Sequence, residues 1–139
     1  MARADASQLF EARAPMFDGD YPKWVKRDLF GGRGDVSVQD LLGNAAMPPF
    51  AAVLACELAP SGKVGAHHQT GADEIVICIG GAGTISVDGN ARPFVPGVVS
   101  YLALGQLLAI ENTSASEKLR YFIIKAVAEK APRQNAPAG

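Results

Sequence analysis

Between residues 50 and 127 the sequence alternates short β-forming runs with turn residues, and this pattern is compatible with only a few folds. The run 84–87 alternates polar and apolar residues and meets Asp88-Gly89, a pair typical of two-residue hairpin turns because both positions favour positive φ. Further runs of this kind cover residues 50–58, 73–79, 92–95, 98–104, 107–111 and 119–126. About eight short strands with glycine turns predict an all-β domain, either a sandwich or a closed barrel.

The segments on either side of this region have a different composition. Residues 1–48 are irregular and predict an N-terminal arm that packs on the barrel or on a partner subunit, with a helical turn in 4–14 and short strands around 21–29 and 35–39. Residues 49–127 form the predicted barrel. Residues 128–139 are rich in Ala, Pro, Gln and Asn and predict a flexible tail.

Charge and composition exclude several classes of partner. The chain carries 13 basic and 14 acidic residues, with no basic stripe that would bind phosphates, so nucleic acid is not an expected partner. No apolar run approaches the roughly 18 residues needed to cross a bilayer, and the first ten residues lack the apolar core of a signal peptide. We therefore expect no membrane association and a cytoplasmic protein. Cys56 and Cys78 lie in apolar runs, which predicts buried free thiols.

One segment, residues 62–74, concentrates ligand-type side chains and holds both histidines of the chain. Because alternate residues of a strand share a face, His67 and Gln69 point together while His68 points away. The turn at 70–72 returns Glu74 toward that face. An imidazole, an amide oxygen and a carboxylate on one side suit a divalent metal such as Fe, Mn, Ni or Zn. In a metal site of this kind, Glu74 or a bound water would move the proton, which makes Glu74 the predicted catalytic residue.

Two spacings in the sequence resemble the motifs of the cupin family, in particular those of small bacterial cupins. The spacing His67-x-Gln69-x₄-Glu74 is similar to the first cupin motif, with Asp73 completing an acidic pair. The second motif aligns without a gap on Gly97, Ala103, Gly105, Leu108 and Asn112. The resemblance covers residues 50–127 and implies a cupin-type double-stranded β-helix, that is, a jelly-roll barrel.

The residues that would hold the metal match the family less well. The resemblance implies two histidines and a glutamate from the first motif and a histidine from the second. This chain has Gln69 and Leu108 at two of these four positions. A competing alignment uses His68, Thr70 and Glu74 instead. The alternative to a metal site is a polar cluster in a pocket that Leu108 makes more apolar.

Further residues are expected to line the same pocket. His68 would contribute if the strand bulges, and Cys78 lies four residues beyond Glu74 on the same face. Tyr101 would orient a ligand through its hydroxyl group, and Leu108 would form apolar wall. The competing interpretation of Cys78, Tyr101 and Leu108 is core packing.

Two functions remain open from the sequence. One is a small-molecule-binding cupin with a reduced metal site and oxygenase- or isomerase-type chemistry, which would be an enzyme. The other is a metal-free module that binds or senses a small molecule without turnover. A barrel whose interior is filled by side chains would favour a purely structural role. Because arms of cupins commonly complete a neighbour's sheet, the resemblance also implies a homodimer.

Overall fold

The computed structural model describes residues 15–18 and 21–127, which form ten strands and two short 3₁₀ helices. The strands are β1 (Lys23–Arg27), β2 (Asp35–Asp40), β3 (Phe50–Leu58), β4 (Lys63–His68), β5 (Asp73–Gly80), β6 (Gly83–Val87), β7 (Asn90–Phe94), β8 (Val99–Leu102), β9 (Leu107–Asn112) and β10 (Leu119–Ala126). The helices are η1 (Leu29–Gly31) and η2 (Gly43–Ala45). Among these described residues, no helix is long and apolar enough to cross a membrane.

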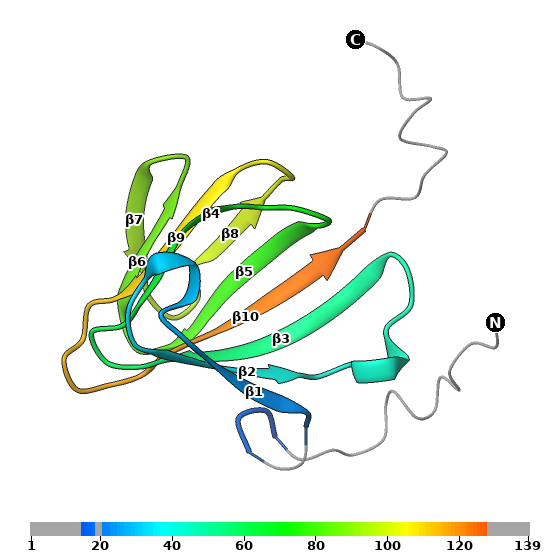
Figure 1. Cartoon of the computed structure of the whole chain (residues 1–139), viewed down its shortest axis with the longest axis horizontal. Helices are drawn as coiled ribbons and strands as arrows, with labels where there is room; N and C mark the ends of the chain where they lie inside the picture. Colours follow the sequence, from blue (N-terminus) through cyan, green and yellow to red (C-terminus); the bar gives the residue numbers. More distant parts are fainter. Residues whose placement is uncertain (1–14, 19–20, 128–139) are drawn as a thin grey trace, which may run out of the picture.

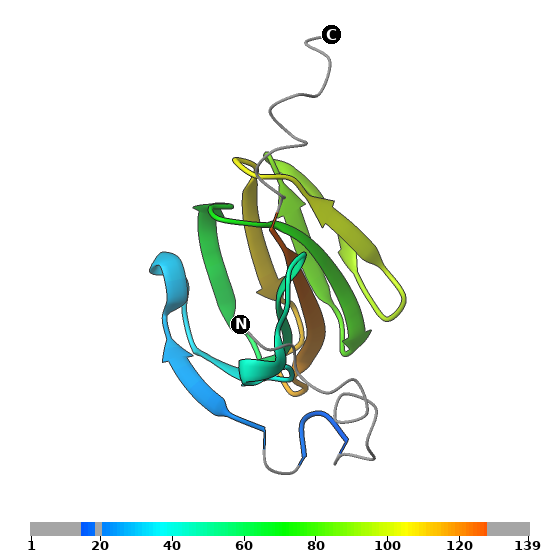
Figure 2. The ribbon, with the colours of Figure 1, turned by 90° about the vertical axis from the view of Figure 1, so that its right-hand side faces the viewer.

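The strands form two antiparallel sheets that enclose the core. The six-stranded sheet has the order β1-β2-β3-β10-β5-β8, and the four-stranded sheet has the order β4-β9-β6-β7. In Figure 1 the strands β2, β3, β10 and β5 lie one above the other in this order, and Figure 2 shows the same sheets from the side. The all-β class and the strands predicted between residues 50 and 127 are thus confirmed.

The predicted N-terminal arm contains two strands that belong to the six-stranded sheet. β2 pairs with β3, with Val36 opposite Leu58 and Val38 opposite Cys56. The side chains of Val36 and Val38 are buried in the core, so the alternation of this strand directs one face into the barrel. The helical turn predicted in 4–14 and the tail predicted from 128 lie outside the described residues.

The core lies between the two sheets and is built from alternate residues of their strands. Its largest buried side chains include Phe94, whose ring meets Tyr121 edge-on with the centroids 5.9 Å apart. Cys56 and Cys78 are both free and buried, as the sequence predicted.

Asn112, the last residue of the second motif, is a buried polar residue at the end of β9. Its Nδ2 atom lies 3.1 Å from the carbonyl oxygens of Leu58 and Ala59, and 2.8 Å from that of Glu117. Its Oδ1 atom accepts a hydrogen bond from the backbone N–H of Ser114 at 2.9 Å. The side chain therefore ties β9 to the end of β3 and to the loop before β10.

Replacing Asn112 with Ala should lower the free energy of unfolding by about 2–4 kcal/mol, because several buried backbone groups lose their partner at once. Urea denaturation with an unchanged m-value would measure this loss. The matched control is Asn90→Ala, at an exposed position of β7, which should change stability by less than about 0.5 kcal/mol. Equal effects of the two substitutions would contradict the anchoring role.

Candidate functional site

A cavity of about 280 Å³ lies between the two sheets at the end where β4 and β10 finish and β5 begins. Its wall is largely apolar and includes Val36, Val38, Leu54, Val64, Ile110 and Ile123. Polar side chains line it as well, namely Lys26, His67, His68, Gln69, Thr70, Glu74 and Lys125. The barrel interior is therefore not filled, and its polar groups come from a few neighbouring strand ends.

The three residues predicted as metal ligands all line this cavity. Gln69 and Glu74 are buried, whereas His67 is half-buried. The turn between Gln69 and Glu74 contains Gly71 at φ +81°, a conformation that favours glycine, and it connects β4 of one sheet to β5 of the other. His68 and Thr70 of the competing alignment line the same cavity, and the pairing of β4 shifts register between Val64 and His67. The shift lies before both histidines, which pair in regular register with Leu108 and Leu107.

The imidazole of His67 is held in a defined orientation. Its Nδ1 atom lies 2.9 Å from the carbonyl oxygen of Gly65, and its ring stacks on that of Phe30 with the centroids 3.8 Å apart. A Cβ atom at Gly65 would lie only 2.0 Å from the carbonyl oxygen of Phe30, so glycine is required for this approach of η1. With Nδ1 donating to Gly65, Nε2 is the nitrogen left to accept a hydrogen bond from a ligand.

The carboxylate of Glu74 is paired with an ammonium group. Lys125 lies directly opposite Glu74 in the register of β10 and β5, and its Nζ atom is 3.0 Å from Oε2 of Glu74. The Glu74 side chain is 4% exposed, whereas that of Lys125 is 36% exposed. The pair therefore places a positive charge at the wall of the cavity and neutralises the buried carboxylate.

These residues do not fit a tightly held divalent metal. The part of the chain that the structure describes has no group of three His, Cys, Asp or Glu side chains able to hold a metal ion. Leu108 lies directly opposite His67 in the pairing of β4 and β9, where the resemblance implied a fourth ligand. An ammonium 3.0 Å from the Glu74 carboxylate would also repel a dication placed on that carboxylate. Among the described residues, the site therefore offers too few ligands for tight binding of a divalent metal.

Two residues expected in the pocket lie elsewhere, while Leu108 lines the cavity. Cys78 shares the inner face of β5 with Glu74, but it lies about 13 Å farther along the strand, at 3.3 Å per residue. There it is fully buried, with Sγ 3.8 Å from the carbonyl oxygen of Phe94. Tyr101 is 60% exposed, because its neighbour Leu102 takes the inward position.

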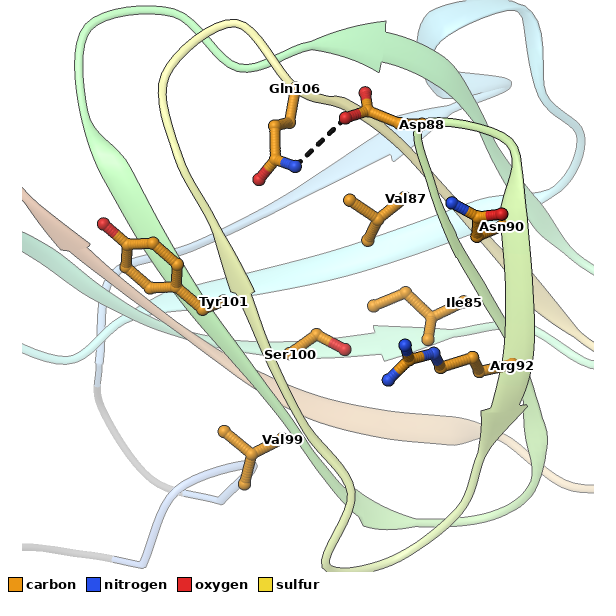
Figure 3. A pocket seen from close by; sticks show the side chains of 9 residues that line it. All are labelled: Ile85, Val87, Asp88, Asn90, Arg92, Val99, Ser100, Tyr101 and Gln106. Carbon is orange, nitrogen blue, oxygen red and sulfur yellow. Dashed lines mark hydrogen bonds between the residues drawn. The ribbon is translucent and has the colours of Figure 1, made fainter.

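Tyr101 instead borders a second cavity of about 300 Å³, between β8 and the β6–β7 hairpin (Figure 3). The side chains of Arg92 and Ser100 point toward each other across this space. Gln106 donates a hydrogen bond to Asp88 at its rim, with a distance of 3.0 Å. This cavity contains none of the predicted metal ligands.

Sequence reasoning missed Lys125, the ion-pair partner of Glu74. The signal was present, because Tyr121, Ile123 and Lys125 alternate in the last strand and therefore share one face. The first two of these residues are of the type found in cores. A lysine in register with them indicates a charged group directed into the barrel.

Burial changes the acidity of two side chains in the cavity wall. It raises the pKa of the Cys56 thiol to about 12, with a smaller contribution from the negative charge of Glu74. Burial also raises the pKa of the Tyr121 hydroxyl well above its usual value, with smaller contributions from Cys56 and Glu74. Both groups are therefore neutral at pH 7, and neither supplies a nucleophile to the cavity.

The native protein should accordingly resist thiol alkylation. At pH 8 the thiolate fraction of Cys56 should be roughly a thousandfold below that of an ordinary cysteine, because its pKa rises from 9.0 to about 12. Iodoacetamide labelling followed by mass spectrometry would measure this, with the urea-unfolded protein as the positive control. In the Cys78→Ser variant, Cys56 is the cysteine that remains to be labelled. Rapid labelling of this variant in its native state at pH 8 would contradict the predicted protection of Cys56.

Similarity to known proteins supports the same fold. The chain is 33% identical over 91 residues to the oxalate-binding protein of Thermotoga maritima, which covers 65% of this chain and 75% of that protein. It is similar in structure to a predicted oxalate decarboxylase from Thermotoga maritima, with a TM-score of 0.69 and 23% identity, over 78% of this chain and 95% of that one. No family model matches the chain.

A second solved structure with a similar fold is that of a cupin. It is a cupin 2 conserved barrel domain protein from Salinispora arenicola, with a TM-score of 0.58 and 28% identity, over 67% of this chain and 76% of that one. The jelly-roll barrel expected from the two motifs is thus shared with solved cupins. Given this barrel and the 33% identity over three quarters of a relative, the chain belongs to the cupin family.

Proposed function

We propose that this cupin binds a small organic carboxylate in the cavity between its sheets. The observation that carries the proposal is the division of that cavity into an apolar wall and a polar end with His67, Gln69 and the Glu74–Lys125 pair. A ligand with a charged head and a short apolar body matches this division. The volume of about 280 Å³ is near the lower limit for small-molecule pockets, which favours a compact ligand.

The charge of the cavity favours an anion over a cation. Two lysines, Lys26 and Lys125, line it together with one carboxylate, that of Glu74. The two ammonium groups and the carboxylate together give a net charge of 2 − 1 = +1. The relative from Thermotoga maritima is an oxalate-binding protein, which supports a carboxylate as the ligand class.

The divalent metal expected from the sequence is not part of this proposal. Lys125 engages Glu74, and Leu108 stands opposite His67. The acid–base role expected for Glu74 is left out for the same reason, because its carboxylate is held in the ion pair. The proposal is thus a binding protein rather than a metalloenzyme.

Binding can be measured by calorimetry on protein treated with a chelator. Benzoate should bind, and benzamide, its neutral counterpart of nearly equal shape, should bind at least about tenfold more weakly because it lacks the charge. Oxalate tests whether a carboxylate without an apolar body is sufficient. Amide NMR shifts that move at Gln69 and Glu74, but not at Asn90 and Arg92 of the second cavity, would place the ligand. If none of the three compounds binds, the proposal fails.

The homodimer predicted from the sequence is also part of the proposal. It is supported by exposed apolar side chains on β5 and the edge strand β8, where Ile75 and Tyr101 are paired and Val99 is 60% exposed. Light scattering should give about twice the chain mass of 14.5 kDa. The substitution Val99→Lys should weaken the dimer if this surface is used. A wild-type mass of one chain would contradict the homodimer.

The cytoplasmic location and the absence of nucleic-acid and membrane partners stay predictions.

A further inference from the structure

The Glu74–Lys125 pair points to a specific mode of ligand binding. We infer that the Lys125 ammonium stands where a divalent ion would stand beside Glu74, and that it holds the ligand carboxylate directly, without metal. The second half of this inference rests on the proposed function. The first half, that a lysine occupies a cation position, can be tested without any ligand.

Burial of Glu74 requires a positive charge next to it. The side chain is only 4% exposed, and an isolated carboxylate at such a position would be strongly unfavourable. Among the described residues, Lys125 is its ion-pair partner. A divalent ion could meet the same need, but only with further ligands, and Leu108 supplies none opposite His67. In this chain the covalently attached ammonium therefore does what a bound cation would do.

The ammonium also has capacity for a ligand. It carries three N–H donors, and Glu74 uses one of them through the 3.0 Å contact. The other two have no recorded partner in the part of the chain that the structure describes, and the side chain lines the cavity and is 36% exposed. A ligand carboxylate can therefore accept a charge-assisted hydrogen bond from Lys125 while Glu74 keeps its own.

Gln69 adds a second donor for that carboxylate. It is 5% exposed, and within residues 15–18 and 21–127 its side-chain amide has no recorded hydrogen-bond partner, so its NH₂ group is available to donate. His67 adds no donor, because its Nδ1–H group donates to the carbonyl oxygen of Gly65 and its Nε2 atom is an acceptor, as a carboxylate oxygen is. Of these groups, the Lys125 ammonium is the charged donor.

The chain offers a matched control for this charge. Lys26 of β1 lines the same cavity, but it is exposed and forms no recorded ion pair with a described carboxylate. A general attraction of anions would depend on both lysines alike. Direct binding by the ammonium next to Glu74 would depend on Lys125 alone.

The first experiment compares Lys125→Met with Lys26→Met by calorimetry with benzoate, on chelator-treated protein. We expect Lys125→Met to weaken benzoate binding at least about tenfold, and Lys26→Met to weaken it less than about threefold. Benzamide binding should be unchanged in both. Because Lys125→Met leaves Glu74 without its partner, the double variant Lys125→Met/Glu74→Gln removes both charges and preserves a neutral, folded site for the same measurement.

The second experiment tests the cation position with Co²⁺, whose visible absorption reports coordination. Wild-type protein should not bind Co²⁺ at equimolar concentration, whereas the double variant Lys125→Met/Leu108→His should bind it. This variant removes the ammonium and adds an imidazole opposite His67. Its matched control is Lys26→Met/Leu108→His, which keeps Lys125 and should not bind Co²⁺.

The outcomes separate this inference from the proposed function. If wild-type protein binds none of the carboxylates, the proposed function fails, and the Co²⁺ result alone decides whether Lys125 occupies a cation position. If benzoate binds equally to wild type and Lys125→Met, or binds only after Mn²⁺, Ni²⁺ or Zn²⁺ is added, the inference is overturned. Co²⁺ binding by the wild type, by both double variants or by neither would overturn it as well.

Discussion

The antiparallel pairing of β10 with both β3 and β5 is the constraint on which the rest of this barrel depends. β10 lies at the centre of the six-stranded sheet and matches β3 from Leu119 to Ala126, with β5 on its other side (Figure 1). A one-residue slip would turn every inward side chain of a strand outward, so this double pairing sets the register of the whole sheet. It also sets which side chains of β10 face the cavity.

The site follows from that register. With Tyr121 inside the core, Ile123 and Lys125 must also face inward, and the pairing with β5 places Lys125 opposite Glu74. His67 of β4 and Gln69, which directly follows β4, come from the side of the other sheet, and both line the cavity together with Glu74 of β5. A charged pair at the polar end of a largely apolar cavity is the consequence, and it supports the proposal that the ligand is a carboxylate.

The two cupin-like motifs contain two kinds of residue. Some shape the backbone, and others stand at the positions where cupins bind a metal. Asn112 keeps its structural task, since its buried side chain ties β9 to two neighbouring loops. Leu108 stands where the second cupin motif has a metal-binding histidine. Its side chain is apolar and lines the cavity wall. The barrel therefore tolerates a change of chemistry at its centre, because its fold relies on pairing and core packing rather than on a metal.

The sequence by itself determined the strands, the turns and the convergence of His67, Gln69 and Glu74, because alternation and turn residues act over a few neighbouring positions. It did not show that β1 and β2 join the barrel's own sheet, nor that Tyr101 faces away from the cavity. Those facts depend on pairing between distant strands and on which neighbour takes the inward position. The tertiary structure alone decided that Lys125 meets Glu74, since these two residues are 51 positions apart in the sequence and only the register of β10 and β5 brings them together.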